Sequence, residues 1–251
     1  MQRLITILLI SGLLVVSCHR QVQPRFSSAD LIKVENTIES DSLVEAYMAP
    51  LRDSIESVMN EIIGQSQAQM VPEKPESPLS HFVADLLQEE ALKEIREINK
   101  DPLPTLTVIN IKGLRAPLPK GDITVRDIYS LMPFENQLII LKLSGREIFQ
   151  LFKHMGNSRG DGLSGASFSF KDQTVINPMV AGEPLQENQF YYVVTSDYLA
   201  NGGDHYTVFA KAREKYTSPQ KIRDIIIYHI RELTKKGKSI DPPHDTRIRL
   251  Q

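Results

Sequence analysis

The chain has 251 residues, of which 41% are hydrophobic and 24% are charged, and its formal net charge is −2. This length allows one large domain or two small ones, and the composition is that of an ordinary globular protein. The near-neutral charge gives no electrostatic sign of nucleic-acid binding, so we expect no nucleic-acid partner.

The first residues have the pattern of an export signal. Arg3 supplies a positive charge, residues 4–16 form an apolar run, and Cys18 follows a serine. The run fits the hydrophobic region of a signal peptide and is short for a membrane span. Residues 15–18 resemble a bacterial lipobox, in which the cysteine is lipidated; the alternative is a secretory signal with an incidental cysteine. Cys18 is the only cysteine of the chain, which excludes an internal disulfide.

This pattern predicts three parts of the chain. We expect residues 1–17 to be a lipoprotein signal peptide, residues 18–40 a tether and lead-in, and residues 41–251 the folded domain. The protein would be exported and lipid-anchored at a bacterial membrane, facing the periplasm. A lipidated cysteine holds a protein at a membrane surface without spanning it.

The first predicted helix starts at Asp41, whose carboxylate can cap it. Apolar residues recur at three- and four-residue steps from Leu43 to Ile63, which is the spacing of an amphipathic helix. Pro50 falls inside this pattern and predicts a kink, and Gly64 is expected to end the helix. Residues 65–78 are polar with three prolines and predict a loop.

Helices and strands then alternate without a repeat. We expect a helix over residues 79–98, a second one opened by the capping box Ser144–Glu147 and closed by Gly156, and a last one starting at Ser218-Pro219. Short apolar runs predict strands at 106–109, 137–143, 166–170, 190–195 and 247–250. This mixture indicates an α+β fold with a mixed β-sheet and packed helices.

Residues for hydrolytic chemistry are not spaced as a catalytic site needs. The six histidines form no metal-binding pattern, and there is no phosphate-binding loop or nucleophile elbow. We interpret His229 as a core or boundary residue of the last helix, and Glu89-Glu90 as a solvated helix face. We therefore expect no catalytic residue, metal site or cofactor in this chain.

The most informative segment is the loop of residues 198–204, which follows the strand at 190–195. Its two consecutive glycines, Gly202 and Gly203, permit positive φ angles and a close approach of backbone to a ligand. Tyr198 offers a stacking face, and Asp204 can accept two hydrogen bonds from a vicinal diol such as that of ribose. The alternative is a tight Asn-Gly turn, with Tyr198 in the core and Asp204 capping a helix. Spacing alone favours this alternative.

The segment Tyr-Leu-Ala-Asn-Gly-Gly-Asp-x-Tyr resembles the loop of the C-terminal, substrate-binding domain of 5'-nucleotidases and UDP-sugar hydrolases. In that family the first aromatic residue stacks on the base and the aspartate binds the ribose hydroxyls. The resemblance implies these roles for Tyr198 and Asp204, with Asn201, Gly202 and Gly203 completing the substrate-binding loop. A tyrosine stands where phenylalanine is commoner, which keeps the ring face.

Two further segments resemble the family in the same order. Residues 108–115 are similar to its Asn-x-Gly-Gly-[Ile/Leu]-Arg segment, which implies that Asn110 lies near the substrate and Arg115 on its phosphate. Residues 123–134 are similar to the segment whose final phenylalanine, here Phe134, is the second base-stacking ring. Weaker landmarks are residues 76–85, in which we expect Asp85 to be structural, 162–165 and 245–248. The likeness extends from Asp41 to Leu250.

One departure concerns the phosphate. Animal members of the family carry a phosphate-binding arginine just upstream of the position of Glu76, where this chain has Glu73-Lys74-Pro75. Lys74 or Lys112 is a candidate to replace it as a point charge.

The resemblance implies a nucleotide- or nucleoside-binding domain that acts in nucleotide catabolism. Because only the tether and lipobox precede the first helix, our leading hypothesis is the substrate-binding half of a split enzyme. A separate metallophosphatase would be its protein partner and would carry the divalent metal. The alternative is a non-catalytic nucleoside- or nucleotide-binding lipoprotein for capture or scavenging, and a third hypothesis is a remnant with a structural role.

Overall fold

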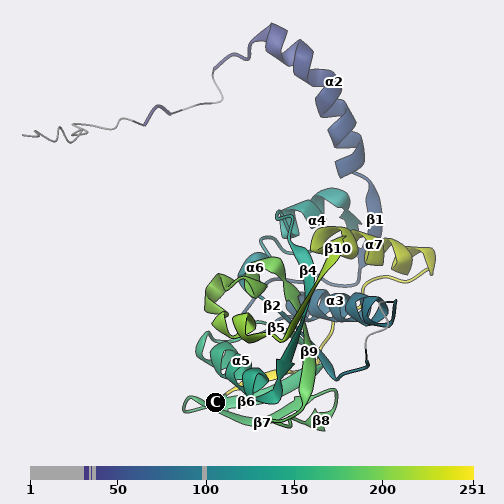
Figure 1. Cartoon of the computed structure of the whole chain (residues 1–251). Helices are drawn as coiled ribbons and strands as arrows, with labels where there is room; N and C mark the ends of the chain where they lie inside the picture. Colours follow the sequence, from purple (N-terminus) through teal and green to yellow (C-terminus); the bar gives the residue numbers. More distant parts are fainter. Residues whose placement is uncertain (1–30, 34, 36–37, 98–100) are drawn as a thin grey trace, which may run out of the picture. The chain divides into compact units, whose positions relative to one another are not determined.

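The computed structural model describes residues 31–33, 35, 38–97 and 101–251 (Figure 1). The predicted signal peptide, Cys18 and most of the predicted tether lie outside these residues. The chain divides into two units, residues 1–48 and residues 49–251. Within the described ranges, no helix combines the length and the apolar character that crossing a membrane requires.

Helix α2 (Ser42–Met59) is the first predicted helix. Asp41 caps it as expected, since its Oδ1 accepts hydrogen bonds from the N–H groups of Leu43 at 2.8 Å and Val44 at 3.2 Å. Pro50 lies inside the helix, and none of the helix residues is buried. The apolar face that the spacing predicts is therefore exposed in the described structure.

The predicted end of this helix is wrong. Gly64 lies in strand β1 (Ile62–Ser66), which pairs with β3 (Gly121–Thr124) in an antiparallel two-stranded sheet. A Cβ atom at Gly64 would lie 2.5 Å from the Ile230 side chain. The glycine thus permits close packing of β1 on helix α7 (Ile222–Lys235) and is not a helix terminator.

A mixed five-stranded sheet forms the centre of the second unit. In spatial order its strands are β10 (Glu214–Lys221), β4 (Gln137–Ser144), β9 (Phe190–Ser196), β2 (Thr105–Ile109) and β5 (Gly162–Ser164). Only β2 and β9 run parallel; the other neighbours are antiparallel. The α+β class with a mixed sheet is confirmed.

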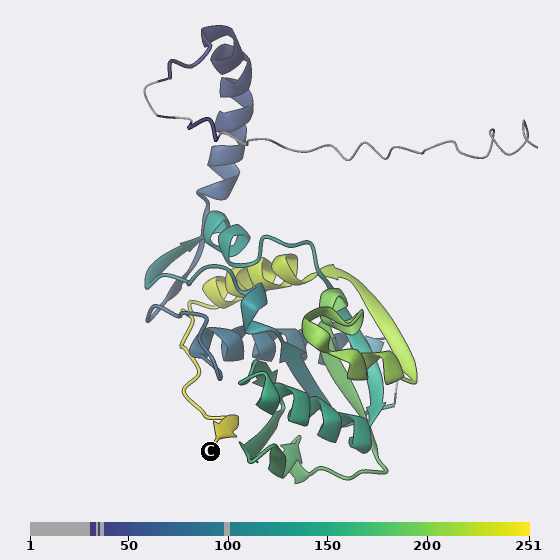
Figure 2. The ribbon, with the colours of Figure 1, turned by 90° about the vertical axis from the view of Figure 1, so that its left-hand side faces the viewer.

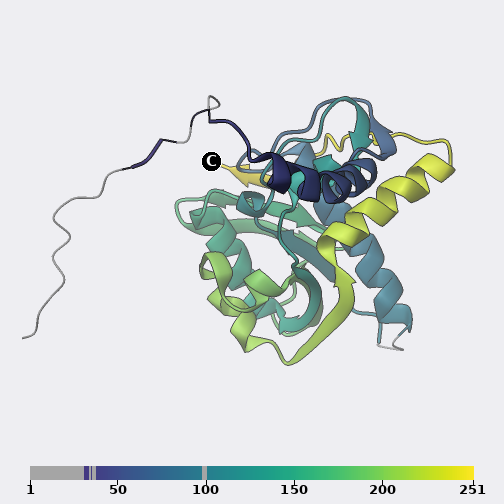
Figure 3. The same ribbon diagram turned by 90° about the horizontal axis from the view of Figure 1, so that it is seen from above.

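The two faces of this sheet carry separate hydrophobic clusters. On β4, Leu138 and Ile140 belong to one cluster, which includes α3 (Pro78–Glu97) and α7, whereas Ile139 and Leu141 belong to the other, which includes α5 (Gly145–Asn157). This alternation is the two-residue period of a strand buried on both faces. Figure 2 and Figure 3 show α7 and α3 on one side of the sheet and α5 on the other.

A smaller sheet lies beside α5. Its strands, in spatial order, are β11 (Ile248–Leu250), β6 (Ala166–Lys171), β7 (Thr174–Val180) and β8 (Glu183–Pro184). The predicted final strand thus forms, parallel to β6. The strands β1, β3, β5, β7, β8 and β10 and the helix α4 (Val125–Leu131) were not predicted, because most of them are short or lack a clear apolar period.

Two predicted helix boundaries differ from the structure. Ser218-Pro219 belongs to strand β10, and the last helix starts at Ile222. Proline is tolerated there because β10 is an edge strand, and the register with β4 shifts between Thr217 and Lys221. Helix α5 continues through Gly156 to Asn157, and a Cβ at Gly156 would lie 2.3 Å from the Phe170 ring. Gly156 therefore allows the Phe170 ring to pack against helix α5 and does not end the helix.

The prediction that His229 is a core or boundary residue is confirmed, and the prediction that Glu89 and Glu90 form a solvated helix face is confirmed only for Glu89. His229 is half-buried, its ring lies 6.3 Å from that of Phe82, and burial lowers its pKa, as fits a boundary residue. Glu89 is exposed, but Glu90 is half-buried and accepts a hydrogen bond from Gln220 at 2.8 Å. Only Glu89 is a solvated position.

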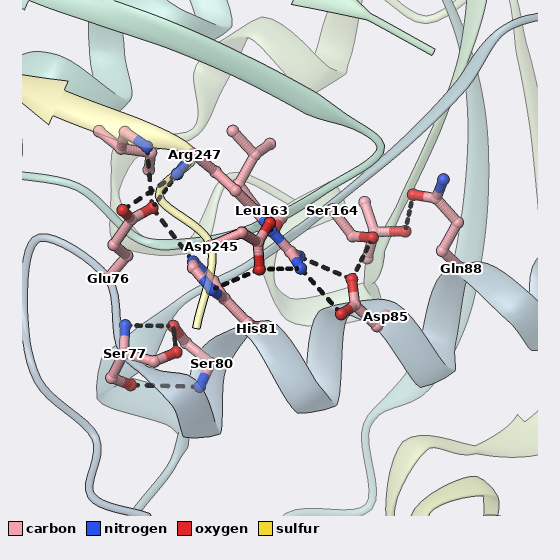
Figure 4. A network of polar contacts seen from close by, with 12 residues as sticks. Glu76, Ser77, Ser80, His81, Asp85, Gln88, Leu163, Ser164, Asp245 and Arg247 are labelled. Atoms are coloured by element: carbon pink, nitrogen blue, oxygen red, sulfur yellow. Dashed lines mark hydrogen bonds and ion pairs between the residues drawn. The ribbon is translucent and has the colours of Figure 1, made fainter. Parts of the chain in front are cut away.

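A polar network joins the start of α3 to the C-terminal strand (Figure 4). The guanidinium of Arg247 donates to both carboxylate oxygens of Asp85, at 2.6 and 2.9 Å, and to the Leu163 carbonyl at 2.7 Å. Glu76 accepts hydrogen bonds from the backbone N–H groups of Arg247 and Ile248. Asp85 therefore stabilises the fold, as predicted, and three of the weaker sequence landmarks meet in this network.

Candidate functional site

A pocket of about 370 Å³ lies at one edge of the central sheet. Parallel neighbours β2 and β9 both end at this edge, and β4, antiparallel to β9, begins there. Segments that are far apart in sequence consequently meet: the turn after β2, the segment between α4 and β4, and the loop after β9.

Five of the eight predicted binding residues line this pocket. They are Asn110, Arg115, Phe134, Tyr198 and Asp204. The remaining lining residues, which were not in the predicted set, are Ile109, Lys112, Gly113, Met132, Asn136, Ser196 and Ile222.

The two predicted stacking rings are both half-exposed at the pocket. Phe134 is 43% exposed and Tyr198 is 47% exposed, so neither ring is a core residue. The Arg115 guanidinium lies 5.9 Å from the centre of the Phe134 ring. Large rings left open to water beside a pocket are suited to cover a flat ligand.

Asp204 is held by side chains from two segments. Its Oδ2 accepts a hydrogen bond from Nδ2 of Asn110 at 2.7 Å, and its Oδ1 accepts one from the Tyr198 hydroxyl at 3.2 Å. Gly202, at φ 92°, makes the sharp turn that the alternative interpretation of this loop expected. The other two parts of that interpretation, which placed Tyr198 in the core and Asp204 at a helix cap, are wrong.

The other three predicted residues do not line the pocket. Asn201 accepts a hydrogen bond from the Lys215 ammonium group at 3.1 Å. Gly202 faces open space, whereas a Cβ atom at Gly203 would lie 2.5 Å from the Tyr198 ring. These residues shape the loop around Tyr198 and Asp204.

The structure distinguishes between the two candidate lysines. Lys112 lines the pocket together with Arg115, and both residues are exposed. The Lys74 ammonium group instead donates to the Ser158 carbonyl at 2.7 Å and lies 3.6 Å from Oδ1 of Asp161. Lys112 is therefore the lysine in position to contact a ligand of this pocket.

Two polar residues that sequence reasoning missed connect the segments of the site. Nδ2 of Asn136 donates to Oδ1 of Asp197 at 2.8 Å, which joins the Phe134 segment to the Tyr198 loop. Asp161 lies beneath the site: its Oδ1 accepts from the Ile111 N–H at 3.0 Å and its Oδ2 from the Tyr206 hydroxyl at 2.6 Å. Burial raises the pKa of Asp161.

The family model described as "5'-nucleotidase, C-terminal domain" matches residues 58–211. The chain belongs to this family. The matched range contains all of the pocket residues except Ile222.

Relatives of this 5'-nucleotidase C-terminal domain support the assignment. An apyrase of Tabanus yao is 24% identical, over 90% of this chain and 44% of its own length. The NAD 5'-nucleotidase of Haemophilus influenzae is 24% identical, over 70% of this chain and 32% of its own length. The 5'-nucleotidase precursor of Thermus thermophilus superimposes with a TM-score of 0.68 at 25% identity, over 82% of this chain and 42% of its own. The chain thus spans less than half the length of these relatives.

Metal-ligating side chains do not gather in the described part of this domain. No three His, Cys, Asp or Glu residues within it lie where they could hold an ion together.

Replacing Asp161 by asparagine should destabilise the domain by about 1–3 kcal/mol, the cost of a buried unsatisfied donor. Both oxygens of Asp161 accept hydrogen bonds, but an asparagine offers one oxygen, so that either the Ile111 N–H or the hydrogen of the Tyr206 hydroxyl loses its acceptor. Urea denaturation of the two proteins measures the difference. Asp172→Asn, at an exposed turn, is the matched control and should change stability by less than about 0.5 kcal/mol. Equal stability of the wild type and Asp161→Asn would contradict this role of Asp161.

Proposed function

We propose that this domain binds a nucleotide or nucleoside in the pocket at the edge of the central sheet. It would act in nucleotide catabolism as the substrate-binding half of a split enzyme. One observation carries the proposal: two half-exposed rings, Phe134 and Tyr198, line the same pocket as the Asp204 carboxylate and two cationic side chains.

The rings account for the base of such a ligand. Stacking of a base on an aromatic side chain contributes about 1–3 kcal/mol and tolerates any base, because every base has a π-face. Phe134 and Tyr198 each leave more than two fifths of their surface open to solvent beside the pocket. A bound base would cover this apolar surface.

The polar groups account for the sugar and the phosphate. Each oxygen of Asp204 accepts one hydrogen bond within the protein, at 2.7 and 3.2 Å, and can accept a further one from a ribose hydroxyl. Arg115 and Lys112 supply positive charge at the same pocket. The Arg115 fork can bond two phosphate oxygens at once, whereas Lys112 acts as a point charge.

The partner part of the proposal rests on the family that the chain belongs to. The matched family is the C-terminal domain of 5'-nucleotidases, and this chain spans 44% of the length of the Tabanus yao apyrase. In our proposal a separate metallophosphatase supplies a metal-activated hydroxide, and this domain supplies specificity and orientation of the substrate.

Two measurements test the proposal. Calorimetric titration of the purified protein with AMP, UMP and adenosine should detect binding of at least one of them. Adding the protein to a metallophosphatase encoded by a neighbouring gene should raise its nucleotidase activity. Binding without stimulation would replace the split enzyme by the alternative, a non-catalytic nucleoside- or nucleotide-binding lipoprotein. Absence of binding to all three ligands would overturn the proposal.

We also propose the lipid anchor that residues 15–18 predict, with the domain facing the periplasm. Because acylation needs the thiol of Cys18, the variant Cys18→Ala should move from the membrane fraction to the soluble fraction of cells that express the full chain. Ser17→Ala, which leaves the thiol in place, is the control and should stay with the membranes. If Cys18→Ala partitions like the wild type, the protein has no lipid anchor at this cysteine.

A further inference from the structure

The hydroxyl of Tyr198 makes two contacts with the same residue. It accepts a hydrogen bond from the Asp204 backbone N–H at 3.3 Å and donates one to the Asp204 carboxylate at 3.2 Å. The ring itself lies against Gly203, where a Cβ atom would come within 2.5 Å of the ring atoms Cε1 and Cζ. Ring and hydroxyl are thus held at separate points of one loop.

Asp204 has a backbone conformation that needs such support. Its φ of 47° and ψ of 31° are left-handed, a conformation that is uncommon for a residue with a Cβ and that aspartate adopts with local hydrogen bonds. Tyr198 binds its N–H, His154 Nε2 lies 3.1 Å from its carbonyl oxygen, and Asn110 binds its Oδ2. Every polar group of Asp204 has a partner, and the Tyr198 hydroxyl contacts both the backbone and the carboxylate.

The Asp204 carboxylate keeps free hydrogen-bond acceptor positions at the pocket. A carboxylate oxygen accepts two hydrogen bonds, and Asn110 and Tyr198 each occupy one position on a different oxygen of Asp204. One position on each oxygen therefore stays available for a ligand. Two neighbouring acceptors in a fixed orientation match two neighbouring hydroxyl groups.

We infer that Tyr198 is a positioning residue for Asp204 as well as a stacking surface, and that its hydroxyl selects ligands in which a flat ring carries a vicinal diol. This inference rests on the proposed nucleoside binding at this pocket. Its new element is the Tyr198 hydroxyl, since binding of a sugar diol by Asp204 is what the family resemblance already implies. A phenylalanine at position 198 would provide the ring but not the hydroxyl.

The test compares adenosine with 2',3'-dideoxyadenosine on the wild type and Tyr198→Phe. The variant keeps the ring on Gly203 but removes one hydrogen bond to a carboxylate and one to the Asp204 N–H. We expect about five- to tenfold weaker adenosine binding and unchanged dideoxyadenosine binding, from a loss of about 1 kcal/mol or slightly more. Asp204→Asn should reduce the same preference, and adding Tyr198→Phe to it should cost little more. Tyr228→Phe, at an exposed ring outside the pocket, is the control that should change neither affinity.

A second measurement needs no ligand. Hydrogen exchange at the Asp204 amide should be faster in Tyr198→Phe than in the wild type, because the hydroxyl no longer accepts from that N–H. Unchanged exchange, or an equal loss of affinity for both nucleosides, would overturn the inference. If the wild type binds neither nucleoside, the proposed function fails, and faster exchange would still establish that Tyr198 positions Asp204.

Discussion

Replacing Tyr198 or Phe134 by alanine should weaken adenosine binding by about 1–3 kcal/mol each, which is roughly five- to 150-fold in the dissociation constant. Each substitution removes one half-exposed ring that lines the pocket and leaves the buried core intact. Calorimetric titration measures the effect. Urea denaturation should show nearly unchanged stability for Phe134→Ala, whereas Tyr198→Ala also loses the two hydrogen bonds to Asp204 and should be somewhat less stable. The double variant should bind adenosine too weakly to measure.

Matched controls exist for both rings. Tyr228 is 54% exposed and Phe149 is 38% exposed, and neither lines the pocket. Tyr228→Ala and Phe149→Ala should bind adenosine like the wild type. If Tyr198→Ala and Phe134→Ala also bind like the wild type, the two rings do not hold the base, and the proposed binding mode is wrong.

Replacing Arg247 by methionine should have the largest effect on stability, about 2–4 kcal/mol. The side chain is 11% exposed and donates to Asp85, to Asp245 and to the Leu163 carbonyl. Methionine has a similar length but leaves these acceptors with fewer donors. Breaking a buried ion pair costs about 3–5 kcal/mol, and the 39% exposure of the Asp85 side chain lowers this figure. Urea denaturation measures the change in the free energy of unfolding.

The effect should depend on pH in a defined direction. The hydrogen bond from Arg247 holds the pKa of Asp245 below its usual range. A lowered acid pKa means that the pair stabilises the fold above the ordinary aspartate pKa of about 4 and loses this contribution as the pH falls through the folded value. The stability difference between the wild type and Arg247→Met should therefore narrow in acid.

The control for this prediction is Arg146→Met. Arg146 and Glu187 form an ion pair at 3.2 Å in which both side chains are mostly exposed, so its loss should cost less than about 1 kcal/mol. The stability loss of Arg247→Lys should lie between those of Arg146→Met and Arg247→Met. A lysine keeps the positive charge, but its ammonium group cannot bond both oxygens of Asp85 in one plane. Equal stability of Arg247→Met and Arg146→Met would contradict a stabilising role of the network in Figure 4.

Local hydrogen bonds explain which elements were predictable. The Asp41 cap and the Ser144–Glu147 capping box join atoms two or three residues apart, and both form in the structure. Ser218-Pro219 has an equally good local pattern for a helix start. There the pairing of β10 with β4, about 75 residues away in sequence, takes precedence over the local preference.

Long-range contacts explain which parts of the site were missed. Asp161 binds Ile111 and Tyr206, which are 50 and 45 residues away in sequence. No spacing rule connects these positions. The choice between Lys74 and Lys112 is of the same kind, because it depends on the Ser158 carbonyl that binds Lys74 from 84 residues away.

The sequence by itself determined the α+β class and five residues that line one pocket, Asn110, Arg115, Phe134, Tyr198 and Asp204. For the five residues, the resemblance of three segments to the family carries this information, since spacing alone did not assign the loop of residues 198–204 to a ligand site. Only the tertiary structure decided that the Tyr198 hydroxyl bonds Asp204 and that Asn136 and Asp161 join the segments. The physical reason is that the Asn136 and Asp161 contacts depend on the antiparallel pairing of β4 with β9 and of β2 with β5, which brings distant segments together, and that the Tyr198–Asp204 contact depends on the conformation of the loop after β9.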